Sequence, residues 1–105
     1  MPEEREGRDV VHCPAFQGAL ELLGARWTGA ILRVLLMGPA RFSDLLEHIP
    51  RLSARLLTKR LVELRSAGLV EHTDEATYAL TSCGQDLGKA FAELERWTAR
   101  WADSR

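Results

Sequence analysis

The sequence is poor in cysteine and has no long apolar run. Its 105 residues include two cysteines, Cys13 and Cys83, which lie far apart and outside any Cys-x-x-Cys pair. This usage argues against a zinc site or a disulfide scaffold. No apolar run approaches the roughly eighteen residues that suggest a membrane span, and the opening residues MPEEREGRDVV lack the apolar region of a secretory signal. We therefore expect a cytoplasmic protein with reduced thiols and no membrane contact.

Catalytic groupings are absent as well. His12, His48 and His72 are scattered, and no Ser, Cys or carboxylate lies at a catalytic spacing from them. No Gly-rich loop that could hold a phosphate occurs either. The sequence thus predicts a protein that is not an enzyme and that needs neither a cofactor nor a metal ion.

The net charge of the chain is close to zero, but the basic residues are concentrated in one segment. The formal net charge is −1, but residues 51–65, RLSARLLTKRLVELR, contain five of the fourteen Lys and Arg residues and one acid, Glu63. A basic segment in a slightly acidic chain indicates an anionic partner. Because most basic helix faces on soluble proteins are simply solvated, this charge alone does not select nucleic acid.

Apolar spacing and helix breakers predict two helices in the first third of the chain. Pro14 opens the first helix, and Gly24 ends it. The second helix follows directly and ends at Gly38 and Pro39, a pair that few helices continue through.

Two further helices are predicted before residue 70. The third is short, with Ser43 as its N-cap and Asp44 in its first turn, and it ends near Pro50. The fourth is capped by Ser53 and closed by Gly68, whose missing Cβ suits the left-handed turn at a helix end.

The pattern then changes from helix to strand. The segments LVEHT and TYALT alternate apolar and polar residues and are separated only by Asp74, Glu75 and Ala76, which predicts a small hairpin. From Ser82 onward the spacing is helical again. We therefore expect a mainly α protein with a small β-hairpin.

The order of these elements is that of a winged helix-turn-helix. A Cys-Pro entry at residues 13–14, Gly-x-x-Trp at 24–27, Arg-Phe-Ser-x-Leu at 41–45 and Leu-Thr-x-x-Gly at 80–84 occur together. In this combination the chain resembles the HxlR family of bacterial transcriptional regulators. The wing is the hairpin, and its turn departs from the family pattern: in the family the wing is usually longer and often carries Pro and Arg, whereas here the turn is Asp74-Glu75-Ala76.

Two organisational expectations follow. We expect a flexible N-terminal arm at residues 1–11 and one winged helix-turn-helix domain at residues 12–105, which includes the helices used for dimerisation. The resemblance implies a homodimer whose two recognition helices meet two half-sites about one DNA turn apart.

The predicted recognition helix, about residues 53–67, has a cationic outer face. With Leu57, Leu61 and Leu64 turned inward, a rotation of 100° per residue places Arg55, Lys59, Val62 and Ser66 outward and Thr58 on the flank. Arg and Lys can donate to guanine in the major groove, and a small apolar side chain can meet a thymine methyl. The candidate base contacts are Arg55, Thr58 and Lys59, and the candidate phosphate contacts at the two helix starts are Arg41, Ser43, Arg51 and Ser53.

Arg60 is expected to have a structural role. It falls nearer the leucine face than Arg55 does, and we expect it to pair with an acid such as Asp44 or Glu47 rather than with DNA.

The terminal helices carry more apolar surface than a small domain is expected to cover. We therefore expect a dimer interface made by these helices, with the alternative that Trp97 simply caps the core of one chain. The candidate interface residues are Phe16, Leu20, Phe91, Leu94, Trp97 and Trp101.

Cys13 is a candidate redox sensor. Several members of the family that the chain resembles respond to electrophiles or oxidants through a cysteine at the matching Cys-Pro position. A thiol at a helix start, beside His12, lies where the helix dipole favours a negative charge. The alternative is a small apolar packing residue. Cys83 is a weaker candidate, because the family usually has no cysteine at that position. A small-molecule effector that binds between the helices is a further alternative to a cysteine sensor.

The sequence therefore predicts a sequence-specific DNA-binding transcriptional regulator, more readily a repressor than an activator, that binds double-stranded operator DNA as a homodimer. The alternative is a winged-helix module whose basic helix meets an acidic protein surface.

Overall fold

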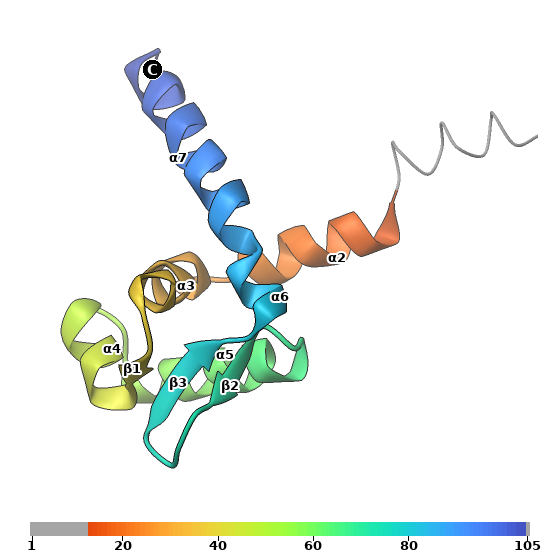
Figure 1. Ribbon diagram of the computed structural model, residues 1–105. Helices are drawn as coiled ribbons and strands as arrows, with labels where there is room; N and C mark the ends of the chain where they lie inside the picture. Colours follow the sequence, from red (N-terminus) through yellow and green to blue (C-terminus); the bar gives the residue numbers. More distant parts are fainter. Residues whose placement is uncertain (1–12, 105) are drawn as a thin grey trace, which may run out of the picture.

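The computed structural model describes residues 13–104, so the arm predicted at residues 1–11 lies outside the described part. In chain order the elements are α2 (Pro14–Leu23), α3 (Thr28–Met37), β1 (Ala40–Arg41), α4 (Phe42–His48), α5 (Ala54–Ser66), β2 (Val70–His72), β3 (Thr77–Leu80), α6 (Ser82–Gln85) and α7 (Leu87–Asp103). Figure 1 shows α3, α4 and α5 gathered around the sheet, with α2 and α7 extending away in different directions. The predicted class, mainly α with a small hairpin, is confirmed.

The sheet contains the predicted hairpin and one further strand. β2 and β3 pair antiparallel, with Val70 opposite Leu80 and His72 opposite Tyr78. β1 pairs with the other edge of β3 and places Ala40 opposite Tyr78. Two residues are too few to show the alternation of a strand, so the sequence pattern did not reveal β1.

The core lies between the sheet and the helices α3, α4 and α5. Leu57, Leu61 and Leu64 are at most 2% exposed, which confirms the predicted inward face of α5. Burying a Leu or Ile side chain contributes about 1.5–3 kcal/mol, so this packing fixes which face of α5 points outward. The core partners from the other elements include Ile31, Leu32, Leu35, Leu45, Ile49, Leu52, Val70 and Leu80.

The chain leaves α5 through a glycine, as predicted. Gly68 has a φ of +80°, a left-handed conformation that favours glycine. The Thr81 hydroxyl then donates to the Gly68 carbonyl at 2.6 Å and accepts from the Gly84 N–H at 3.1 Å. A Cβ at Gly84 would clash with the carbonyl oxygen of Leu69. These contacts give a physical reason for the Leu-Thr-x-x-Gly pattern at 80–84.

The start of α4 differs from the prediction. The helix begins at Phe42 with Arg41 as its N-cap, so the predicted N-cap role of Ser43 is wrong. Arg41 is held extended by pairing with Thr77, and the helix starts as soon as this strand ends. Asp44, the third residue of the helix, accepts from the N–H of this N-cap residue through its Oδ2 at 3.0 Å, as the acid of a capping box does.

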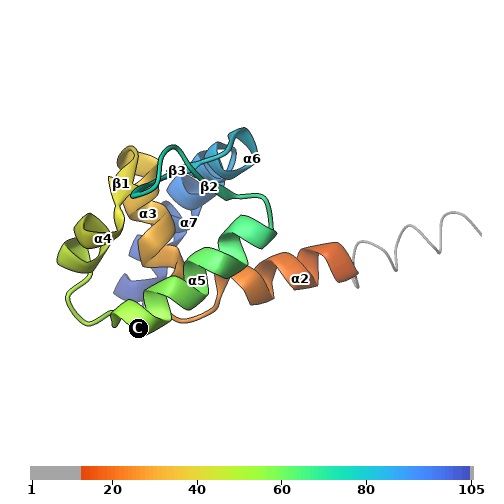
Figure 2. The same cartoon turned by 90° about the horizontal axis from the view of Figure 1, so that it is seen from below.

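The two outer helices contribute little to the core. All residues of α2 and α7 are described, and none of them is buried. In Figure 1 both helices extend beyond the packed group formed by the sheet, α3, α4 and α5. In Figure 2 α2 again extends to the side, whereas α7 lies behind this group. The segment predicted as one helix from Ser82 onward is divided into α6 and α7 at Asp86. Among the described residues, we find no helix whose length and apolar character would let it cross a lipid bilayer.

Candidate nucleic-acid interface

The outward face of α5 is basic and exposed. Arg55, Thr58 and Lys59 are all exposed on the side opposite the buried leucines. Within residues 13–104, no carboxylate forms an ion pair with Arg51, Arg55 or Lys59. Figure 2, seen from below, shows α5 running across the near side of the molecule. A helix surface whose cations are not neutralised internally is suited to a polyanion.

The start of α5 is organised as predicted. Ser53 is the N-cap, and its Oγ accepts from the Leu56 N–H at 3.1 Å. The first N–H groups of a helix point out from its positive end, where phosphates bind. Arg51 is exposed two residues before this cap. The structure therefore brings two of the predicted phosphate contacts, Arg51 and Ser53, to one helix end.

Arg41 and Ser43, the other two predicted phosphate contacts, are exposed at the start of α4. The strand pairing of Arg41 with Thr77 sets this helix start against the base of the wing. The charge of Arg41 also acts on the wing residue Asp74. The structure thus connects the start of α4 with the hairpin, a relation that depends on β1.

Asp74 holds the turn of the wing. Its Oδ1 accepts from the Ala76 N–H at 2.9 Å and from the Thr77 N–H at 3.0 Å. The hydrogen bond from Ala76, those from Thr77 and the charge of Arg41 hold the pKa of Asp74 below its usual value, against a smaller opposing effect of desolvation. Glu75 is exposed at the tip. The two wing acids therefore have different surroundings, because Asp74 stabilises the turn.

Arg60 is structural, as predicted, but its predicted partners are wrong. Its side chain is only 13% exposed and pairs with Glu63 at 3.1 Å rather than with an acid of α4. Its Nε also donates to the carbonyl oxygen of Arg26 at 2.9 Å. Arg26 lies in the turn between α2 and α3, next to Trp27, which has a left-handed φ of 73°. The pair with Glu63 could have been predicted, because residues three apart are neighbours on a helix. Nothing in the sequence indicated the hydrogen bond to the Arg26 carbonyl, which lies 34 residues away in the chain.

The predicted interface residues are mostly exposed. Trp97 and Trp101 remain 47% and 44% exposed, and their rings stack with centroids 5.4 Å apart. Trp97 does not belong to the core cluster, so it does not cap the core. Phe91 differs from the rest because it packs partly buried against the core of its own chain. The remaining three, Phe16, Leu20 and Leu94, are each more than half exposed.

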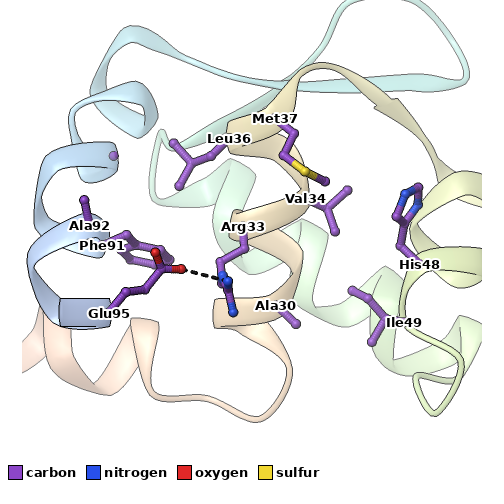
Figure 3. A pocket seen from close by; sticks show the side chains of 11 residues that line it. Ala30, Arg33, Val34, Leu36, Met37, His48, Ile49, Phe91, Ala92 and Glu95 are labelled. Atoms are coloured by element: carbon purple, nitrogen blue, oxygen red, sulfur yellow. Dashed lines mark ion pairs between the residues drawn. The ribbon is translucent and has the colours of Figure 1, made fainter. Parts of the chain in front are cut away.

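An open cavity of about 560 Å³ lies between α3, α4 and α7. Figure 3 shows Arg33 directed toward Glu95 at one end and His48 at the other, with Val34 and Met37 between them. The ion pair between Arg33 and Glu95 has a distance of 2.8 Å and links α3 to α7. A second cavity of about 440 Å³ lies between α2, α3 and α7. The helices thus leave room for a small molecule or for side chains of another chain.

Cys13 caps α2. Its Sγ accepts from the Phe16 N–H at 3.5 Å, and the residue is partly exposed. Cys83 is exposed on α6. His12, predicted to lie beside the Cys13 thiol, is outside the described residues.

A short helix, a turn, a second helix with a basic outer face and an antiparallel hairpin define a winged helix-turn-helix, a class of DNA-binding protein. The model of the HxlR-like helix-turn-helix family matches residues 22–105. The chain belongs to this family and is a DNA-binding transcriptional regulator.

Two regulators, YodB and HypR, are similar to this chain over most of their length. The HTH-type transcriptional regulator YodB of Bacillus subtilis (strain 168) is 36% identical over 97 residues, which cover 87% of each chain. Quinone-bound YodB has a TM-score of 0.80 at 39% identity, covering 85% of this chain and 99% of that one. For reduced YodB the TM-score is 0.82 at 35% identity, covering 90% and 98%. The reduced redox regulator HypR has a TM-score of 0.77 at 25% identity, covering 86% and 95%.

Proposed function

We propose that the protein is a cytoplasmic repressor, which blocks transcription by binding an operator as a homodimer. The observation that carries this proposal is the outward face of α5, where exposed cations have no carboxylate partner within the described chain. Occupying DNA requires no chemical step, so the proposal needs neither a catalytic group nor a cofactor.

Each predicted contact has a role in this proposal. Arg55, Thr58 and Lys59 face the base edges of the major groove from the outer side of α5. The exposed starts of α4 and α5 carry the four phosphate contacts, which fix the position of α5 on the duplex: Arg41, Ser43, Arg51 and Ser53.

A second copy of the chain is proposed to cover the exposed apolar surface of the two outer helices, α2 and α7. Five of the seven large hydrophobic side chains that are exposed among the described residues lie on α2 and α7. A surface of this kind is typical of a protein interface rather than of an isolated monomer. A dimer also provides two recognition helices, as an operator with two half-sites requires.

We also propose that an oxidant or an electrophile acts on the regulator through Cys13. Support comes from its position as the partly exposed cap of α2, one of the two proposed interface helices. A quinone-bound and a reduced form are known for the relative YodB. Modification of this sulfur would disturb the helix start and, through the interface, the spacing of the two recognition helices.

Selection of bound fragments from the genome of the source organism tests the function. Recovery of a few promoter segments with a shared two-fold sequence is the expected result. Binding of that duplex is then measured across salt concentrations for wild type, Arg55→Ala and the control Lys89→Ala, which removes an exposed cation from α7. Binding without sequence preference would favour the alternative, a module that meets an acidic protein surface.

A further inference from the structure

We propose that Thr58 and Val62 form a methyl patch on α5 that contacts the C5-methyl group of a thymine in each half-site. This inference rests on the proposed operator binding and adds a base to the expected operator. The thymine lies beside the base that Arg55 or Lys59 contacts.

Val62 is the first observation. It is 55% exposed, although it is a β-branched apolar residue in the middle of a helix whose leucines are buried. The other large hydrophobic side chains exposed among the described residues lie on α2 and α7 or, for Met37, at the end of α3. Val62 is therefore separate from the proposed dimer surface and lies on the basic face.

Thr58 is the second observation. Its hydroxyl donates to the Ala54 carbonyl at 2.9 Å, so the hydroxyl hydrogen is engaged within the helix. The Cγ2 methyl then becomes the part of the side chain that an apolar partner can meet. Residues four apart on a helix are neighbours, so this methyl and Val62 form one small apolar surface.

The surroundings of the methyl patch favour DNA as its occupant. Lys59 is three residues before Val62, and Arg55 is three residues before Thr58, so cations flank the patch on the outer face. Two small side chains are far below the area that a specific protein interface buries, about 1,200 Å² or more in total. In the major groove, the thymine methyl is the apolar group that distinguishes one base edge from the others.

Replacement of thymine by uracil tests the proposal, because uracil lacks only this methyl group. The tightest duplex recovered from a random-sequence library is synthesised with one thymine at a time replaced, and the dissociation constant is measured by fluorescence anisotropy at fixed salt. Burial of one methyl group corresponds to about a fourfold change in affinity. We expect such a loss at one thymine position of each half-site for the wild-type protein.

Variants assign the effect to the patch. Val62→Ala should bind the thymine and uracil duplexes nearly equally, and alanine preserves the helix. Thr58→Val keeps a methyl and should keep the discrimination, whereas Thr58→Ser keeps the hydroxyl and should weaken it. Ser66→Ala, also on the exposed surface of α5, is the control and should leave the ratio unchanged.

Three outcomes would overturn the inference, and they separate failure of operator binding from failure of the methyl contact. If the protein selects no sequence from the library, the proposed operator binding fails together with the methyl contact. If it selects an operator but no uracil replacement weakens wild-type binding, or if Val62→Ala keeps the full penalty, operator binding stands and the methyl contact is wrong.

Discussion

At the scale of single residues, side chains on and around α5 and the wing differ in whether their polar groups already form bonds within the chain. Arg60 and Asp74 make internal hydrogen bonds. Arg51, Arg55 and Lys59 have no carboxylate partner among residues 13–104. Substitution of the first group should change stability, and substitution of the second should change DNA binding.

Arg55→Ala or Lys59→Ala should weaken operator binding by about 1–3 kcal/mol, because each removes a cation that we propose to contact a base edge. The loss should be accompanied by relaxed preference at one position of the half-site, measured by binding to a panel of single-base operator variants. A loss that is equal on every duplex would assign the residue to a phosphate instead.

Arg51→Ala should behave in the opposite way, since Arg51 lies at the start of α5 rather than on its outer face. Binding to all duplexes should weaken uniformly, and the slope of log K against log salt should fall by about one unit. Titrations at four or more salt concentrations measure this slope. A shift of base preference would contradict the phosphate role.

The two acids of the wing should respond differently to substitution. Glu75→Lys should strengthen binding to any duplex, because it replaces an exposed acid, which would repel phosphates, by a cation that attracts them. Asp74→Lys should gain less, since it also removes the acceptor of the hydrogen bonds from Ala76 and Thr77. Anisotropy titrations of both variants on operator and on unrelated DNA compare the two effects.

The pKa of Asp74 gives a check that does not involve DNA. Because the pKa is lower in the folded protein, the carboxylate stabilises the fold at neutral pH, and this contribution is lost as pH falls from the unfolded value through the folded one. Asp74→Asn should therefore be less stable at neutral pH, and the difference should shrink on acidification. A difference that is constant with pH would show that ionised Asp74 does not hold the wing.

At the scale of elements, those with a repeated pattern were predictable. Leu57, Leu61 and Leu64 recur at helical spacing, and the buried face of α5 follows from them. β1 was not predictable because two residues have no period, and the error at Ser43 followed from missing that strand. The bond from Arg60 to Arg26 depends on tertiary approach and leaves no local signal.

Arg60→Ala should lower the free energy of unfolding by about 1.5–3 kcal/mol, because the Arg26 carbonyl and Glu63 both lose a charged donor. Urea unfolding followed by circular dichroism measures the change. Arg65→Ala on the same helix is the matched control and should stay within about 0.5 kcal/mol, since Arg65 is exposed. Equal stability of the two variants would remove Arg60 from the structural role.

Trp97→Ala and Trp101→Ala should weaken association of two copies by about 2 kcal/mol or more, because large aromatic side chains commonly anchor interfaces. Both residues are nearly half exposed in the single chain, and their rings stack on each other. Multi-angle light scattering over a dilution series measures the dimer fraction. A wild-type monomer at tens of micromolar, or a fully dimeric double variant, would exclude these residues from the interface.

At the scale of the whole molecule, the proposed regulation depends on how α2 and α7 are connected to the packed group. α2 carries Cys13 at its start and joins α3 through a turn whose Arg26 carbonyl is held by Arg60 of α5. A displacement of α2 can therefore act on the recognition helix of its own chain as well as on the proposed interface.

Cys13→Ser should bind the operator normally in reducing buffer, because a serine hydroxyl can cap α2 in place of the sulfur. It should no longer lose DNA affinity after treatment with peroxide or a quinone, whereas wild type should. Cys83→Ser is the matched control and should respond like wild type. Identical responses of wild type and Cys13→Ser would leave Cys13 as a packing residue.

All residues of α2 are described and none is fully buried, and only Leu22 and Leu23 at its end pack partly against the core, so the stability of this helix depends on the concentration of the protein. Ten residues are fewer than the roughly 12–15 at which an isolated helix becomes even marginally stable in water. In the proposed dimer, much of the order of α2 then comes from the second copy, and folding of this segment is coupled to association. The helical content should fall on dilution, and the cellular abundance of the regulator would itself set the fraction of molecules competent to hold two half-sites.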